Sequence, residues 1–168
     1  NKKMLGSLYD FPEKTMAIGR LDEPSEGLLL LTTNGKVSEF IRSSKIEKEY
    51  YAQVDGNITT EAIEALKKGI EISTENGLYT TKNCEVKALP ETPKIPERAK
   101  KIRDDRHGPT SWVSITLTEG KFRQVRKMTA AVGFPTLRLV RVRIGNIEIK
   151  NMQPGEVKEL HKLENLIA

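Results

Sequence analysis

The sequence predicts an α+β fold in which a mixed, largely antiparallel sheet is flanked by peripheral helices. Residues 111–118 alternate strictly between polar and apolar, as a half-buried strand does, and residues 59–69 carry the start and stop signals of a helix. The element order also mixes hairpin-like strands with helices, which favours this class. The 168 residues are enough for one large domain or for two small lobes that share a core.

The predicted elements follow one another along the whole chain. Strands are expected where apolar or β-branched residues run or alternate, at 28–31, 48–54, 70–73, 84–89, 111–118 and 137–144. Helices are expected at 37–42, 59–69, 121–133 and 161–167. Residues 90–110 contain four prolines among charged residues and predict a long irregular loop, which is either a functional arm or a solvated loop.

The helix at 59–69 and the strand at 111–118 are the best-marked elements. The segment opens on Thr59-Thr60 with a capping threonine and ends on Gly69 as the expected stop, while Ile63 and Leu66 face the core. The strand turns one face inward, and that face consists of Val113, Ile115 and Leu117. Its opposite face consists of Trp112, Ser114, Thr116 and Thr118.

Composition excludes several classes of protein. Apolar residues make up 37% of the chain, and no apolar run approaches the roughly 20 residues that span a bilayer. The single cysteine, Cys84, excludes an internal disulfide, and with only His107 and His161 beside it a zinc site is not expected. Cys84 lies in an alternating segment and is expected to be a buried structural thiol.

The positive charge is concentrated in one segment. The formal net charge is +5, and the stretch from Gly120 to Arg143 holds seven basic residues and no acidic one. Within it, the predicted helix at 121–133 has two faces. The apolar face consists of Phe122, Val125, Met128 and Val132, and the basic face of Arg123, Arg126 and Lys127 with Ala130. This pattern predicts an anion-binding face, such as one for nucleic acid; the alternative is a solvated face.

Asp22 lies in a short polar turn directly ahead of four leucines. A carboxylate held at the mouth of a core element is suited to catalysis, because a reactive group needs rigid support. The alternative is that Asp22 is an ordinary turn residue that binds its own backbone. The residues alone leave both interpretations open.

Four segments resemble a known family. Residues 19–35 resemble the signature G-R-L-D-x-x-[ST]-x-G-L-L-L-L-T-x-[DN]-G of the RsuA/RluB/RluE branch of the RNA pseudouridine synthases. Residues 48–50 resemble its K-x-Y element, residues 119–128 its E-G-[RK]-x-[RH]-Q-V-R-[RK]-M element, and residues 132–141 its V-G-x-P-[TV]-x-x-L-x-R continuation. The V-G-F-P-T-L-R-L run and the S-E-G after Asp22 are most similar to the RluE-like subgroup.

The resemblance implies a pseudouridine synthase fold with a central catalytic cleft. It implies that the chain, 1–168, is a catalytic domain that isomerises one uridine of ribosomal RNA, in the large subunit, to pseudouridine. No cofactor and no metal are implied, and the protein is expected to be a cytoplasmic monomer. The family's usual N-terminal strand with K-P-x-G is expected to be missing, since the chain begins at Asn1, and no S4-like RNA-binding module is expected.

The resemblance also assigns roles to residues. Asp22 is the implied essential carboxylate, Arg126 its partner, and Tyr50 the residue that packs against the target base. The implied RNA contacts are Arg20, Lys48, Lys121, Arg123, Lys127, Arg138 and Arg141. The loop at 90–110 becomes a candidate RNA-contacting arm. Whether Asp22 attacks the ribose or the uracil ring, or abstracts a proton, stays open.

Physical chemistry explains why these residue types suit the reaction. Burial by itself favours the neutral form of a carboxylic acid, so a fixed cation must oppose it. A planar, always charged guanidinium suits this task better than an ammonium group. The target uridine must also leave its stack to reach Asp22. The alternative for Tyr50 is a core aromatic, and Tyr51 faces the other side of the same strand.

Two other functions are compatible with the sequence. One is a non-catalytic RNA-binding domain, for instance a ribosome-assembly factor. The other is the same chemistry on tRNA or mRNA. The presence of Asp22, Tyr50 and Arg126 together argues against the first, because binding alone does not need a carboxylate near RNA.

Overall fold

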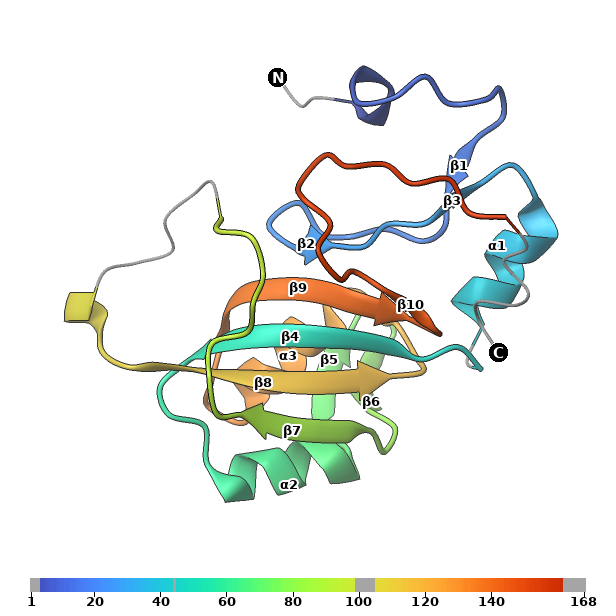
Figure 1. The fold of residues 1–168 in the computed structure, drawn as a ribbon. Helices are drawn as coiled ribbons and strands as arrows, with labels where there is room; N and C mark the ends of the chain where they lie inside the picture. The colour runs from blue at the N-terminus through green and yellow to red at the C-terminus, as the bar shows by residue number, and fades with distance from the viewer. Residues whose placement is uncertain (1–3, 44, 99–104, 162–168) are drawn as a thin grey trace.

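The structure, a computed structural model, describes residues 4–43, 45–98 and 105–161 and has the predicted α+β class. Its centre is a six-stranded sheet in the order β10-β9-β4-β8-β7, with β2 attached to β9 (Figure 1). These strands are β2 (Glu26–Gly27), β4 (Lys48–Asp55), β7 (Glu85–Leu89), β8 (Thr110–Leu117), β9 (Thr136–Ile144) and β10 (Ile147–Glu148). The β2–β9 pair is parallel, whereas the other pairs in this sheet are antiparallel.

One face of this sheet carries the main core. Helices α2 (Thr60–Lys68) and α3 (Gln124–Ala131) and the hairpin of β5 (Glu71–Thr74) and β6 (Gly77–Thr80) lie behind or below the sheet in Figure 1. Ala52 and Ile115 of the sheet pack in one cluster with Leu66 of α2 and with Val125 and Met128 of α3. Burial of these side chains therefore fixes α3 against the sheet.

A second, smaller core lies beside β9. It is built from β1 (Met16–Ala17), which pairs with β3 (Leu31–Thr32), and from α1 (Gly35–Arg42); η1 (Leu5–Ser7) is a 3-10 turn ahead of them. Its buried residues are Ile18, Leu28, Leu30, Ile41, Ile46 and Ile144. No helix in the described ranges is long and apolar enough to cross a membrane.

The leucine run is the first difference from the predicted elements. Leu28 and Leu30 are buried as expected, but residues 28–30 do not form a regular strand. The chain changes partner there, because Leu28 N donates to Arg141 O of β9 and Leu30 O accepts from Ile18 N. The run therefore crosses from one sheet to the other, and only β2 and β3 at its ends are strands.

Strand β8 is buried on both faces, so the prediction of a half-buried strand was wrong. Val113 and Ile115 face the main core, yet Trp112 is only 6% and Ser114 only 5% exposed. The chain between Leu89 and Arg98 runs over that second face, where Arg138 lies 6.0 Å from the Trp112 ring and donates to Pro96 O. Alternation of polar and apolar residues indicates that one face of a strand is apolar, but it gives no sign of a loop that buries the other face.

The remaining predicted elements hold with small changes. Thr59 caps α2 by accepting from Ala62 N, and Gly69 ends it. Strand β6 was not predicted, although its Asn76-Gly77 turn is a hairpin signal. Residues 90–98 are irregular, and η2 (Asp105–His107) is a 3-10 turn. The helix predicted at 161–167 lies, apart from His161, outside the described residues.

Cys84 was predicted to be a buried structural thiol, and in the structure it is only partly buried. Its Sγ donates to Leu66 O at 3.3 Å and is half-buried between β7 and α2. Burial, with a smaller contribution from Glu119, raises the pKa of this thiol to about 11. The thiol is therefore protonated at neutral pH.

Candidate active site

Asp22 opens a tight turn that is tied to the central sheet. Ser25 N donates to Asp22 O at 2.9 Å, and the next two residues form β2. Gly27 has φ +110°, and a Cβ there would lie 2.2 Å from Arg141 O. Only glycine fits this close approach, so Gly27 lets the turn that carries Asp22 lie directly against β9.

Two arginines of β9 hold the turn in place. Arg138 donates from Nε and Nη2 to both carboxylate oxygens of Glu26, at 2.8 and 2.9 Å. Arg141 donates from Nε and Nη2 to Leu28 O, at 2.9 and 2.6 Å, and is 7% exposed. Both were predicted to contact RNA. In the structure the Arg141 guanidinium is buried against Leu28 O and the Arg138 guanidinium is paired with Glu26, so both side chains hold the turn, and a contact with RNA stays a prediction for each.

Helix α3 brings its arginine to the same turn. Arg126 Nε lies 4.0 Å from Asp22 Oδ2, and Arg126 Nη2 donates to Ser25 Oγ at 3.1 Å. Arg123 Nη1 lies 3.6 Å from the same carboxylate oxygen. The predicted pair Asp22 and Arg126, which is 104 positions apart in the sequence, is thus brought together in space.

The charge around Asp22 is unbalanced toward positive. Two guanidinium groups lie within 4.0 Å of this one carboxylate. A third, Arg98, donates to Pro24 O at 3.2 Å in the same turn. Burial lowers the pKa of Arg126, repulsion from Arg123 and Arg98 lowers it further, and Asp22 opposes these effects. An excess of fixed cations beside one carboxylate suits an anionic ligand such as a phosphate.

Tyr50 lies on the α3 side of β4. It pairs with Arg141 of β9 and Ile115 of β8 and packs, half-buried, against the main core. Tyr51 points to the opposite face, as expected for its neighbour in a strand. Lys48 precedes them and donates to Ser43 O at 3.3 Å; burial, and then Arg141, lower its pKa.

The other predicted basic residues gather near the start of α3. Arg20 lies 5.3 Å and Lys127 5.7 Å from the centroid of the Phe122 ring. Lys127 Nζ also donates to Ser73 O at 2.7 Å. Lys121 Nζ lies 4.8 Å from the Tyr79 ring. Arg20, Arg123 and Lys127 therefore share one region with Asp22, while Lys121 is directed to the β5–β6 hairpin.

A buried polar network fixes the turn before α3, and the sequence interpretation missed it. Gln124 is 3% exposed; its Oε1 accepts from Lys121 N and its Nε2 donates to Glu119 Oε2. Glu119 also accepts from Tyr79 OH and from Lys82 N. Burial acts to raise the pKa of Glu119, but these hydrogen bonds outweigh it and the pKa is lowered. The network joins the turn to β6.

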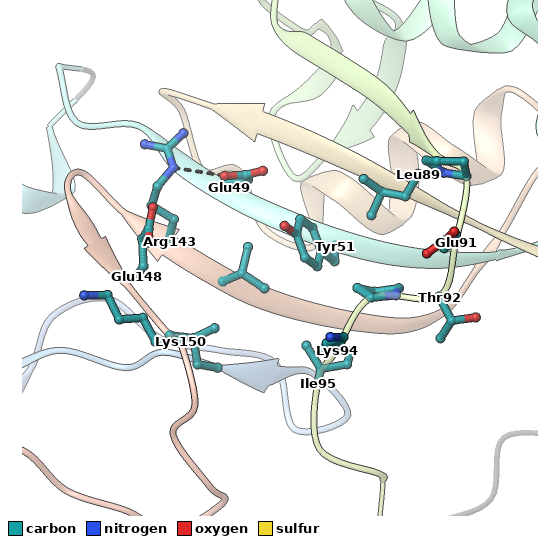
Figure 2. A pocket seen from close by; sticks show the side chains of 14 residues that line it. Glu49, Tyr51, Leu89, Glu91, Thr92, Lys94, Ile95, Arg143, Glu148 and Lys150 are labelled. Atoms are coloured by element: carbon teal, nitrogen blue, oxygen red, sulfur yellow. Dashed lines mark hydrogen bonds and ion pairs between the residues drawn. The ribbon is translucent and has the colours of Figure 1, made fainter.

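A cavity of about 590 Å³ lies on the other face of the sheet (Figure 2). Tyr51 and Glu49 of β4 line it together with the chain from Leu89 to Ile95, and Glu49 pairs there with Arg143 at 2.9 Å. Asp22, Tyr50 and Arg126 do not line this cavity. In the described ranges, no group of three or more His, Cys, Asp or Glu residues could hold a metal ion.

Comparison with known proteins shows which family this chain matches. The profile of the family described as "RNA pseudouridylate synthase" matches residues 1–131. The "Ribosomal large subunit pseudouridine synthase E" of Vibrio parahaemolyticus is 43% identical over 146 residues, which are 86% of this chain and 59% of that protein. The protein of the same name from Xanthomonas campestris is 39% identical over 150 residues, 88% of this chain and 78% of that protein.

A solved structure agrees with the sequence comparisons. The "Crystal structure of pseudouridylate synthase" superposes with a TM-score of 0.77 at 28% identity, over 98% of this chain and 65% of that one. The chain spans about three fifths of the length of the Vibrio parahaemolyticus relative.

Proposed function

This chain belongs to the RNA pseudouridylate synthase family, and we propose that it isomerises one uridine of large-subunit ribosomal RNA to pseudouridine. The observation that carries the proposal is the carboxylate of Asp22, held in a turn against β9 and faced by Arg126 from α3. The names of the Vibrio and Xanthomonas relatives support ribosomal RNA as the substrate.

The reaction needs an ionised carboxylate beside an extruded nucleoside. The bond between N1 of uracil and C1′ of ribose breaks, the base turns, and a bond from C5 to C1′ forms. N1 gains a proton and C5 loses one, so the atoms balance. We assign Asp22 as the reacting carboxylate and Arg126 as the cation that keeps it ionised in a half-buried turn.

Tyr50 and the surrounding cations complete the proposed site. Tyr50, on the same side of the sheet as α3, would pack against the extruded base. Arg20, Arg123 and Lys127 would bind phosphates next to it, because their charges exceed what Asp22 can neutralise. Extrusion of a base costs a few kcal/mol, and stacking and phosphate contacts offset that cost.

We add Arg98 to the proposed RNA contacts because its guanidinium donates to Pro24 O in the Asp22 turn. It reaches the Asp22 turn from the Pro-rich segment that the sequence predicted to be either an arm or a solvated loop. Repulsion from the Arg98 guanidinium also contributes to the lowered pKa of Arg126, in keeping with this contact. This contact favours the interpretation of the Pro-rich segment as a functional arm over that of a solvated loop. Cytoplasmic location and a monomeric state stay predictions.

The test uses RNA labelled with tritium at C5 of uridine. Purified protein is incubated with transcripts of large-subunit rRNA, small-subunit rRNA and tRNA, and release of tritium to water is measured. We expect release from the large-subunit transcript at one position, which sequencing for pseudouridine then locates. Release from tRNA alone would establish the chemistry on another substrate, and no release from any transcript would contradict the proposal.

A further inference from the structure

Phe122 is exposed where the sequence pattern predicts a core residue. The pattern places it on the apolar face of a helix with Val125 and Met128. In the structure the helix begins only at Gln124, and Phe122 is 56% exposed, while Val125 and Met128 are 5% and 0% exposed. A single exposed aromatic ring is ordinary on a protein surface, so the position of Phe122 beside a charged site, and not its exposure alone, carries the argument.

A rigid turn keeps the Phe122 ring exposed. Arg123 adopts the left-handed conformation, with φ 54° and ψ 33°, which is strained for a residue with a side chain. The network of Glu119 and Gln124 fixes the residues on both sides of Phe122. Strain of this kind persists only where the surroundings impose it, and it is concentrated at functional sites.

The ring lies at the rim of the Asp22 site. Arg123, the next residue, lies 3.6 Å from the Asp22 carboxylate. The guanidinium of Arg20, two residues before Asp22, lies 5.3 Å from the ring centroid, and the Lys127 ammonium lies 5.7 Å from it. An aromatic ring between cations is the arrangement that binds single-stranded RNA, because a base stacks on the ring and the cations bind the adjoining phosphates.

We propose that Phe122 is a stacking platform for the base next to the extruded uridine. The inference rests on the proposed function, because it needs RNA at Asp22. A base displaces one of the two cations from the ring, since base stacking is the stronger interaction, and the displaced cation is then free to bind phosphate.

Affinity for RNA gives the first test. The probe is a short single-stranded RNA of mixed sequence with a fluorescein label, and binding is followed by anisotropy. We expect Phe122→Ala to weaken binding about 10-fold or more, with an unchanged dependence on salt, because stacking is not ionic. The matched control is Phe40→Ala, which removes a ring of similar exposure, 49%, from α1. The control is expected to bind as the parent does.

Tryptophan fluorescence gives a direct readout of stacking. Phe122→Trp is expected to bind RNA as the parent does and to lose fluorescence on binding, whereas Phe40→Trp is expected to show no change. The native Trp112 is 6% exposed and supplies a constant background. The proposal is overturned if Phe122→Ala binds like the parent, or if the fluorescence of Phe122→Trp stays constant while RNA binds. Neither result depends on turnover, so failure of the proposed catalysis would show separately, as absence of tritium release by the parent.

Discussion

Arg126 Nε faces Asp22 Oδ2 at 4.0 Å and, within the described residues, is buried without a hydrogen-bond partner. The neighbouring Nη2 is engaged by Ser25 Oγ at 3.1 Å. Buried polar groups are normally satisfied, and contacts in a site without its ligand often tighten only when the ligand binds. The unsatisfied donor supports the proposal that Asp22 and Arg126 close on one another, or on substrate, during the proposed reaction.

The geometry of the Arg126 guanidinium predicts that a positive charge at this position is not enough for turnover. Arg126→Lys keeps the charge but loses the planar guanidinium, in which Nη2 donates to Ser25 Oγ while Nε faces Asp22. We expect the single-turnover rate to fall about 100-fold in this variant and in Arg126→Ala, with a small change in affinity. The control is Arg42→Lys, at an exposed position in the last turn of α1, which should leave the rate unchanged. If Arg126→Lys keeps the parent's rate, the planar guanidinium of Arg126 is not required.

The partners of the basic residues predict different responses to salt. Arg123→Ala removes an exposed charge beside Asp22, so the slope of log K against log salt for RNA binding should fall by about 1. Arg138→Ala should leave that slope unchanged, because Glu26 already neutralises the guanidinium. It should instead lower the free energy of unfolding by about 1 to 3 kcal/mol, measured in urea. A reduced slope for Arg138→Ala would instead support the prediction that Arg138 contacts RNA.

Local signals in the sequence were enough to predict most of the helices and strands. Alternation located β8, and the Thr59 and Gly69 signals located α2. Of the basic segment, Arg123 and Arg126 lie beside Asp22 and Lys127 lies near the Phe122 ring, while the other basic residues have partners elsewhere. That the segment binds an anion stays a prediction. The pairing of Asp22 with Arg126 came from the family motifs, because no local rule relates residues 104 positions apart.

The rest depended on tertiary contacts that no residue pattern contains. Sequence gives the charge of Arg141 but not its direction, and the side chain turns inward to Leu28 O. Helical periodicity predicted that Phe122 faces the core. It could not show that Arg123 adopts a left-handed backbone conformation, so that the helix begins after Phe122. The leucine run was taken for a strand because its change of partner from β9 to β1 depends on where those strands lie.

The Glu119 network predicts a pH-dependent part of the stability. The folded pKa of Glu119 lies below its ordinary 4.5, because three hydrogen bonds outweigh burial. A lowered carboxyl pKa stabilises the fold above the unfolded pKa, and this stabilisation is lost as pH falls through the folded pKa. Glu119→Gln should therefore be less stable at neutral pH by about 1 to 2 kcal/mol, and the difference should shrink below pH 4.5.

Urea unfolding of the parent and the variant over this pH range checks the prediction. Glu64→Gln is the control, since Glu64 forms an exposed pair with Lys67 and its side chain is 51% exposed. That variant should differ little from the parent at any pH. A constant gap between parent and Glu119→Gln from neutral to acid pH would show that the charge of Glu119 does not stabilise the turn.

The most direct measurement compares Asp22→Asn with the parent in one assay of binding and turnover. Asparagine keeps the size of the side chain and removes the carboxylate, so the turn and the surrounding arginines keep their positions. We expect the variant to bind large-subunit rRNA with the affinity of the parent or better, while its rate of pseudouridine formation falls on the order of 10³-fold or more. Pseudouridine formed by Asp22→Asn at the parent's rate would overturn the assignment of Asp22 as the reacting carboxylate.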